Sequence, residues 1–466
     1  MSAFDRLKEN IVAAGPKVIS AGHAAAASAG ASAYAKGGNA FDAALAACFM
    51  EHIVLPMKCG IAGDLVALFR TGGGAFQSLV SIGAGARAIA DGAKVERTGP
   101  NAVGVPGAPH GYAILQAYGR IALGDLALPA IRAASGGVPW TRVARSYVVE
   151  GAPLLARYSP GNPYAPGGRI PEVGEIRRLP GLGKLLEAFV ELRESVLESE
   201  IGERIVARVR ELGGFLTRED FAQRPGRIAD AASGRIAAGL TLRVTPAPTH
   251  GPQLIEIARR FLAKEADLPT VIRAARAEAK ARGREPGDGG TSVVTAADDE
   301  GNAVVILHSN SFPQFASGVV LDDGLILNNR PGRGFDLQAP PGAANAPAAG
   351  KVPWTTLHAW ALTYENDETL IGATPGGVNQ LPWNAQTVTE LARGPDIASV
   401  MTNPRWSLDA ENVLAAEEGV SPSISADRAI GALSLRSAQQ VIRLGKNGLH
   451  RIAADPRAGA TAISVY

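Results

Sequence analysis

Cysteine is scarce in this chain of 466 residues, which contains only Cys48 and Cys59. The two residues form no C-x-x-C pair or other metal-ligand spacing, which argues against a zinc module and a disulfide framework. We expect both to be reduced residues of the core. Charge is also sparse, at 19% of residues with a net charge of +2, and this argues against a nucleic-acid partner. The basic run at 273–284 is interrupted by Glu278, as in a solvated helix.

Long hydrophobic runs are absent as well. The longest apolar stretch, residues 40–57, is broken by Asp42, Glu51 and His52, and it falls short of a membrane span. Residues 1–17 carry charges of both signs and lack the apolar core of a secretion signal. The sequence therefore predicts a cytoplasmic protein with no membrane association.

Several common catalytic and cofactor motifs are missing. We find no G-x-S-x-G nucleophile elbow, no H-E-x-x-H zinc helix, no complete dinucleotide fingerprint and no P-loop. We therefore predict no nucleotide, no other cofactor and no metal site. His250, His308 and His358 are interpreted as polar or structural residues rather than catalytic bases.

The residues that are present describe a packed globular protein. Hydrophobic residues make up 46% of the chain, and its length allows one large domain or several smaller ones. Runs of strands interspersed with helix pairs favour an α+β fold with largely antiparallel sheets. Helices are predicted in 17–51 after an initial strand, from about 111, in 201–212, 253–264 and 273–282, and around 383–392; strands are predicted at 65–69, 76–82, 240–244, 318–321, 325–329, 357–364 and 461–465.

One stretch stands out as a hairpin with an unusual beginning. Gly289-Gly290 leads into Thr291, and two β-rich segments at 291–294 and 303–307 are joined by a turn of Asp, Gly and Asn residues. By itself this pattern predicts only a hairpin.

Seven short motifs change that interpretation, because they occur in the order found in the gamma-glutamyltranspeptidase family. They are Lys36–Ala44, Gly60–Asp64, Gly104–Gly107, Gly213–Asp220, Gly290-Thr291, Leu327–Asn329 and Pro375–Gly377. The chain resembles this family over nearly its whole length. The resemblance implies an N-terminal-nucleophile hydrolase fold, a four-layer αββα sandwich. It also implies that segments 1–290 and 291–466 form one interlocked domain, a heterodimer of the chain's own fragments that can assemble further into a homo-oligomer.

The resemblance further implies a catalytic set. The chain would cleave itself between Gly290 and Thr291, and the new α-amine of Thr291 would serve as the base for its own hydroxyl. Ser309 falls where the family has a threonine that supports the nucleophile. Gly376 and Gly377 match the paired glycines whose N–H groups stabilise the oxyanion. Their alternative interpretation is a turn that leads into a helix.

The substrate-binding positions depart from the family pattern. The family's arginine for the substrate α-carboxylate falls in the segment 83–88, where this chain has Arg87 at a shifted position. Thr355 and Thr356 stand in place of a Ser-Ser pair that binds carboxylate, although they are also ordinary strand residues.

A second departure changes the sign of a charge. After Asn329 the family has acids that hold the substrate α-amino group, whereas this chain has Arg330 and Arg333. Cations at this place favour an anionic end on the substrate. The sequence resembles most the divergent branch that includes oxamate amidohydrolases.

The function predicted from the sequence is hydrolysis of a small carboxylate-bearing amide through an acyl-enzyme. Three alternatives are a true gamma-glutamyl transferase or glutathione hydrolase, a biosynthetic relative that cleaves a C–C bond, and a non-catalytic scaffold. A single full-length band on denaturing electrophoresis would favour the scaffold.

Overall fold

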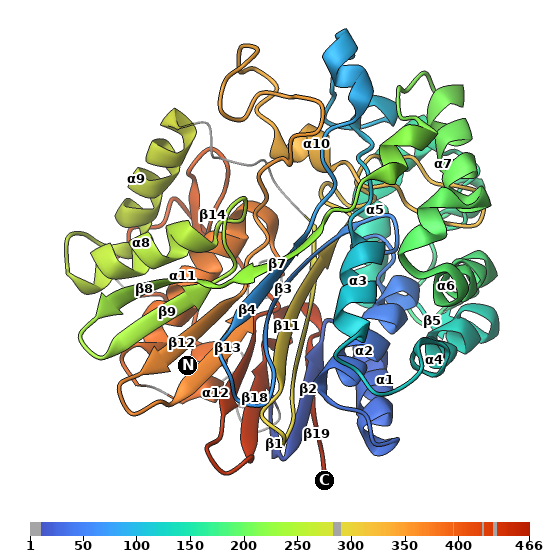
Figure 1. Ribbon diagram of the computed structural model, residues 1–466. Coiled ribbons are helices and arrows are strands. Elements are labelled where there is room, and N and C mark those ends of the chain that lie inside the picture. Colours follow the sequence, from blue (N-terminus) through green and yellow to red (C-terminus); the bar gives the residue numbers. More distant parts are fainter. Residues whose placement is uncertain (1–10, 283–289, 395, 422–423, 432–435) are drawn as a thin grey trace.

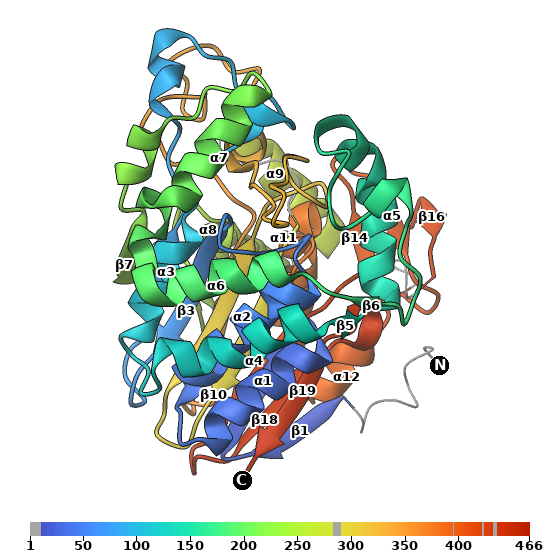
Figure 2. The same ribbon diagram turned by 90° about the vertical axis from the view of Figure 1, so that its right-hand side faces the viewer.

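The computed structural model describes residues 11–282, 290–394, 396–421, 424–431 and 436–466. Two antiparallel sheets are stacked face to face, and helices cover both outer faces (Figures 1 and 2). This is the four-layer αββα arrangement that the family resemblance implies.

Figure 1 shows α1–α6 on the side of one sheet, with α1, α2 and α3 directly on it, and α8, α9 and α11 on the side of the other. The first sheet has the order β1-β18-β17-β13-β12-β9-β8. Its strands are β1 (Val12–Gly15), β8 (Ala232–Ala237), β9 (Leu240–Val244), β12 (Trp360–Tyr364), β13 (Thr369–Ala373), β17 (Gln440–Leu444) and β18 (His450–Ala454). Its outer face packs on α8 (Gly251–Leu262), α9 (Leu268–Ala281), α11 (Gln380–Leu391) and α12 (Ile397–Thr402).

The second sheet has the order β19-β2-β10-β11-β3-β4-β7. Its strands are β2 (Lys17–Ala21), β3 (Asp64–Arg70), β4 (Gln77–Ser81), β7 (Gly226–Asp230), β10 (Ser292–Ala297), β11 (Ala303–Ser309) and β19 (Thr461–Val465). Helices on its side of the molecule are α1 (Ala24–Ala35), α2 (Ala40–Val54), α3 (Ala108–Gln116), α4 (Leu123–Gly136), α5 (Arg142–Tyr158), α6 (Pro180–Leu192) and α7 (Glu200–Glu211).

Strand alternation decides which side chains face the other sheet. In β11, Val305 and Leu307 belong to the apolar layer between the sheets, whereas Val304 and Ile306 pack under the helices. Successive side chains of a strand point to opposite faces. Ser309 therefore lies on the inter-sheet face of β11 and His308 on its helix face.

Both sheets combine strands from either side of Gly290. In the second sheet, β10 pairs with β2, and β11 pairs with β3. In the first sheet, β9 pairs with β12 and β1 with β18. A break before Thr291 would therefore leave the two segments joined by complete ladders of backbone hydrogen bonds.

The motif at 36–44 forms the start of α2, and its polar residues cap that helix. Asn39 and Asp42 make a reciprocal capping box, which satisfies N–H groups at the helix N-terminus. The N–H of Ala40 donates to the carboxylate of Asp298, at 2.8 Å. This contact fixes α2 against the turn between β10 and β11.

Most predicted elements are present, with shifted ends. The 291–307 hairpin is formed by β10 and β11, in which Ser292 pairs with His308. The predicted hairpin at 318–329 is reduced to one bridge, between Val320 and Ile326. The helix predicted at 273–282 begins earlier, at Leu268, because Asp267 caps it. Among the strands of the two large sheets, β1, β7, β8, β13, β17 and β18 were not predicted.

Shorter elements complete the described part of the chain. They are α10 (Arg330–Gly334), β5 (Val138–Pro139), β6 (Ile176–Arg177), β14 (Trp406–Leu408), β15 (Leu414–Ala416) and β16 (Arg428–Ala429). Within the described ranges, no helix has the length and apolar character needed to cross a membrane.

Candidate active site

Thr291 directly precedes β10, a central strand of the second sheet (Figure 2). Its side chain is fully buried. The preceding residue is fixed by the backbone, since the N–H of Gly290 donates to the carbonyl oxygen of Ser311 at 2.9 Å. A Cβ on Gly290 would lie 2.7 Å from that same oxygen, so the position requires glycine.

The Ser309 hydroxyl connects Thr291 to the carbonyl group before it. Thr291 Oγ1 donates to Ser309 Oγ at 3.4 Å, and Ser309 Oγ in turn donates to the carbonyl oxygen of Gly290. The N–H of Ser311 also donates to Ser309 Oγ, at 3.0 Å. These three bonds use the one donor and two acceptor positions of a hydroxyl, so Ser309 is held in a single orientation.

Gln380 is a site residue that the sequence interpretation missed. Its side-chain amide Nε2 donates to Thr291 Oγ1 at 3.1 Å and is 3.4 Å from Thr356 Oγ1. Gln380 is the first residue of α11 and is fully buried. The available signal was its position three residues after the Gly376-Gly377 pair.

Gly376 and Gly377 form the turn into α11. Their φ angles are 137° and 57°, both in the region that favours glycine. A Cβ on Gly376 would lie 2.2 Å from the Trp383 ring. The turn leads through a 3-10 segment, Gly377–Asn379, to Gln380, so the glycine pair lies within one helical turn of a residue that contacts Thr291.

The two threonines at 355 and 356 have different surroundings. Thr356 shares the Gln380 amide with the nucleophile candidate. Thr355 accepts a hydrogen bond from the N–H of Leu357 at 3.2 Å, and its own N–H donates to the carbonyl oxygen of Pro248 at 2.9 Å. The structure thus brings Thr356 to the site and places the Thr355 hydroxyl in a local turn.

His358 holds the backbone at Thr356 in place. Its Nδ1 lies 2.8 Å from the Thr356 carbonyl oxygen, and its Nε2 lies 2.9 Å from the Asn384 amide nitrogen. Only a neutral ring with the proton on Nδ1 satisfies both contacts. Burial lowers the pKa of His358 to about 4, which agrees with a neutral ring.

Asn328 and Asn329 anchor the loops around the site. Asn328 Nδ2 donates to the carbonyl oxygens of Ala62 and Gly104, at 2.8 and 3.0 Å. Asn329 Nδ2 donates to the carbonyl oxygens of Arg97 and Phe312, at 2.8 and 2.9 Å. Three of the motifs found in the sequence are therefore joined through these amides.

Arg330 forms a buried ion pair. Its Nε lies 2.7 Å from Asp64 Oδ2, and the side chain is 2% exposed. Burial raises the pKa of Asp64, and the neighbouring Arg330 opposes that shift. Arg330 Nη2 has no hydrogen-bond partner among the described residues. Asp64 thus offsets the charge of Arg330, a partner that the sequence interpretation did not assign to it.

The other two arginines are placed differently. Arg333 is partly buried, and its Nε donates to the Phe312 carbonyl oxygen at 2.8 Å while its guanidinium lies 5.7 Å from that residue's ring centre. Phe312 follows Ser311, which contacts Gly290. Arg87 has an exposed side chain at the start of a 3-10 helix, and its backbone N–H donates to Asp220.

Comparison with characterised proteins gives relatives of one kind. The chain is 28% identical to glutathione hydrolase 3 of Arabidopsis thaliana over 243 residues. This aligned region covers 50% of this chain and 38% of that protein. It is 25% identical to the glutathione hydrolase-like YwrD proenzyme of Bacillus subtilis, over 80% of this chain and 81% of that one. It is 26% identical to the oxamate amidohydrolase proenzyme of Klebsiella pneumoniae, with the same coverage.

Solved structures show the same fold. Cephalosporin acylase from Bacillus halodurans superposes with a TM-score of 0.83 at 23% identity, covering 98% of this chain and 97% of that one. Gamma-glutamyltranspeptidase from Helicobacter pylori gives a TM-score of 0.51 at 23% identity, covering 56% and 82%. The gamma-glutamyltranspeptidase family profile matches residues 26–267 and 258–465. The chain therefore belongs to the gamma-glutamyltranspeptidase family.

Proposed function

We propose that this chain is an amidohydrolase that first cleaves itself before Thr291 and then hydrolyses a small carboxylate-bearing amide through an acyl-enzyme. The observation that carries the proposal is the arrangement of Ser309. Its hydroxyl contacts both the Thr291 hydroxyl and the Gly290 carbonyl oxygen. In self-cleavage the first would be the nucleophile, and the second would carry the developing negative charge.

Self-cleavage would proceed by transfer of an acyl group from nitrogen to oxygen. Thr291 Oγ1 attacks the Gly290 carbonyl carbon, and negative charge develops on the oxygen that Ser309 contacts. The C–N bond breaks, the proton of the hydroxyl ends on the new amine, and an ester joins Gly290 to Thr291. Water then hydrolyses the ester to give fragments 1–290 and 291–466.

The mature fragment would carry its own base. An α-amino group has a pKa of about 7.7–8.0, so part of it is neutral near pH 7.5 and can accept the hydroxyl proton of Thr291. The amide carbon of the substrate would be attacked next, and the N–H groups of Gly376 and Gly377 would stabilise its oxyanion. Water is the proposed acceptor that releases the acyl group.

A carboxylate-bearing substrate is supported by the charge around the site. Asp64 pairs with Arg330, and we propose that Arg333 and hydroxyl donors such as Thr356 contact the anionic end of the substrate. The relative named for oxamate hydrolysis favours the same class. Hydrolysis of glutathione or transfer of gamma-glutamyl groups remains the second candidate, because several relatives are named glutathione hydrolases.

Cytoplasmic residence remains part of the proposal. Cys48 and Cys59 are both free and buried, which suits a reducing compartment.

Denaturing electrophoresis with mass measurement tests the first step. We expect two fragments that begin and end at the Gly290–Thr291 bond, and a single full-length chain in Thr291→Ala. An uncleaved wild-type chain that stays intact on incubation would exclude the proposal. Turnover retained by Thr291→Ala would exclude Thr291 as the nucleophile.

A panel of amides tests the substrate class. We expect oxamate and similar small amides of dicarboxylates to be hydrolysed in preference to a gamma-glutamyl anilide. The opposite preference would support the second candidate. It would also contradict the inference that Arg333 selects a substrate with an anionic end.

A further inference from the structure

A second polar cluster lies on the helix face of the nucleophile sheet, directly behind the proposed active site. It consists of Glu51 at the end of α2, Cys59 in the loop before β3, and His308 in β11. All three are buried, and one oxygen, sulfur or nitrogen from each lies within 4.8 Å of the other two. His308 precedes Ser309, whose side chain points to the opposite face of β11.

The side chains of Glu51 and His308 are each held in place by a further hydrogen bond. Glu51 Oε1 accepts from the N–H of Gly22 at 2.7 Å, while Oε2 lies 2.6 Å from His308 Nε2. His308 Nδ1 contacts the Tyr112 hydroxyl at 2.7 Å, and that hydroxyl contacts His52 Nε2 at 2.9 Å. Metal-binding imidazoles and carboxylates are usually oriented by such outer contacts.

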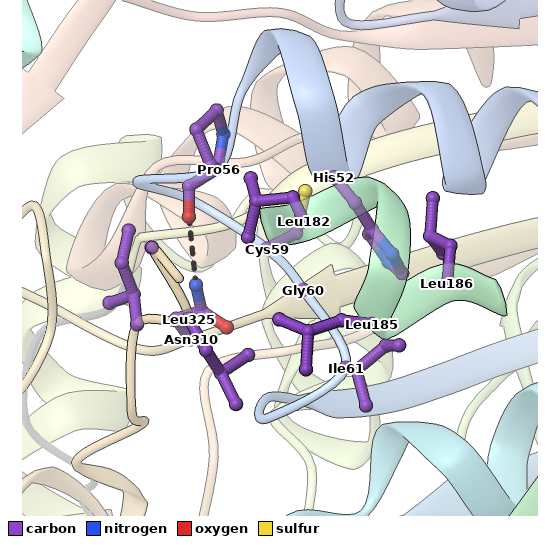
Figure 3. A pocket seen from close by; sticks show the side chains of 12 residues that line it. His52, Pro56, Cys59, Gly60, Ile61, Leu182, Leu185, Leu186, Asn310 and Leu325 are labelled. Atoms are coloured by element: carbon purple, nitrogen blue, oxygen red, sulfur yellow. Dashed lines mark hydrogen bonds between the residues drawn. The ribbon is translucent and has the colours of Figure 1, made fainter. Parts of the chain in front are cut away.

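A small cavity lies beside Cys59, one of the three residues of the cluster. It has a volume of about 20 Å³, and its lining includes Cys59, His52 and Asn310 (Figure 3). His52 Nδ1 and Asn310 Oδ1 are buried and have no partner among the described residues. A cavity needs roughly 10–15 Å³ to hold one water molecule and polar groups to bind it. The space therefore fits one water molecule beside Cys59.

We propose that Glu51, Cys59 and His308 bind a divalent transition-metal ion of borderline softness, for which Zn²⁺ is the natural probe. Thiolate, imidazole and carboxylate are its common protein ligands, and three of them with one water make a tetrahedral set. A thiolate and a carboxylate together carry two negative charges, which an ion of charge +2 neutralises. The metal-bound site thus holds no net charge, which lowers the cost of burying its ligands in an apolar layer.

The protons of the cluster can be rearranged so that it binds the ion. Without the ion, Nε2–H of His308 donates to Glu51, and its Nδ1 accepts from Tyr112. With the ion, Nε2 binds the metal, Nδ1–H donates to Tyr112, and Tyr112 donates to His52 Nε2, which leaves the His52 proton on Nδ1. The imidazole and phenol groups keep their total number of protons, and the Cys59 thiol releases the one that leaves.

The site would be structural. It joins the end of α2, the loop around Cys59 and strand β11, and so fixes the strand that carries Ser309 on its other face. It is separate from the proposed reaction, because Thr291 and Ser309 lie on the strand faces of Val293 and Leu307, which pack between the sheets.

Metal content of the mature protein, with both fragments present, tests the proposal. After purification without chelator and dialysis against Zn²⁺, we expect about one zinc ion per chain for a single three-ligand site. Exchange with Co²⁺ should add thiolate-to-metal charge-transfer absorption. Wild-type protein that binds no zinc, or a cobalt derivative without that absorption, would overturn the proposal, and neither result depends on the folding of a variant.

A pair of cysteine variants locates the ion. Cys59→Ala should retain less than about a tenth of the wild-type zinc, because the removed thiolate is one of three ligands. Cys48→Ala, which removes the other buried cysteine from α2, should retain it all. Circular dichroism of both variants checks the fold. Equal zinc in the two variants would refute the assignment of Cys59.

Discussion

The Gln380 side chain donates a hydrogen bond to the hydroxyl of Thr291, across 3.1 Å. Gln380 begins α11, immediately after the segment Gly377–Asn379, and Thr291 directly precedes β10. One contact thus joins the proposed oxyanion turn to the proposed nucleophile. It fixes the position of the hydroxyl relative to the glycine N–H groups.

Gln380→Leu should slow turnover by about 10- to 100-fold. Leucine has a similar size but cannot donate the hydrogen bond to the reacting hydroxyl, which contributes about 1.5–3 kcal/mol. The loss should appear mainly in kcat, measured by steady-state kinetics. Gln386→Leu is the matched control, since Gln386 is a buried glutamine of the same helix that contacts Trp406 and not Thr291. Equal losses in both variants would mean that helix damage, rather than the Thr291 contact, explains the effect.

Ser309→Ala should slow cleavage of the chain by about 10²–10³-fold, the usual cost of losing a donor to a developing oxyanion. Ser309→Thr keeps the hydroxyl and should still cleave. The rate is measured as loss of the full-length band with time after synthesis. Ser292→Ala is the control, because Ser292 is buried in the neighbouring strand with its side chain on the helix face. Wild-type cleavage in Ser309→Ala would remove this residue from the reaction.

Gly376→Ala should abolish most turnover, because its added Cβ would meet the Trp383 ring at 2.2 Å and move the turn. Gly394→Ala separates this clash from backbone strain. Its φ is 83°, and a Cβ there has no neighbour within 4 Å. We expect Gly394→Ala to lower the free energy of unfolding by only about 1 kcal/mol, with normal turnover. Similar activity in both variants would contradict a special role for the Gly376 turn.

Local patterns in the sequence were sufficient to predict the fold class and the β10–β11 hairpin. Two runs rich in β-branched residues and a Gly/Asn/Asp turn indicate that hairpin without any distant contact. Glycine motifs were equally visible, and the structure explains one of them through Asn328, which binds the carbonyl oxygens of Ala62 and Gly104.

Contacts between distant residues could not be predicted in this way. Arg330 and Asp64 are 266 positions apart, and the sequence therefore showed a cation without the acid that offsets it. Gln380 is 89 positions from Thr291, and His308 is 257 from Glu51. Spacing rules find metal ligands and catalytic pairs only within local motifs. Side chains that meet across a sheet leave no such signal.

Stability should fall as the pH is lowered from 6.5 to about 4, and His358 should account for part of the loss. Burial lowers the pKa of His358 from 6.5 to about 4. In this window the unfolded ring binds a proton and the folded ring does not, so acid favours the unfolded state. Such a pKa difference corresponds to about 3 kcal/mol, lost in full once the pH is below 4.

Urea unfolding at pH 8, 6.5, 5 and 4 measures this dependence. In His358→Asn the side-chain amide can still donate to the Thr356 carbonyl oxygen but cannot titrate, so the fall in the free energy of unfolding should be smaller. Some fall should remain, because burial also lowers the pKa of His52 and His250 well below the usual value. An identical pH dependence in the variant and the wild type would show that His358 takes up its proton equally in the folded and unfolded states, contrary to its neutral role between Thr356 and Asn384.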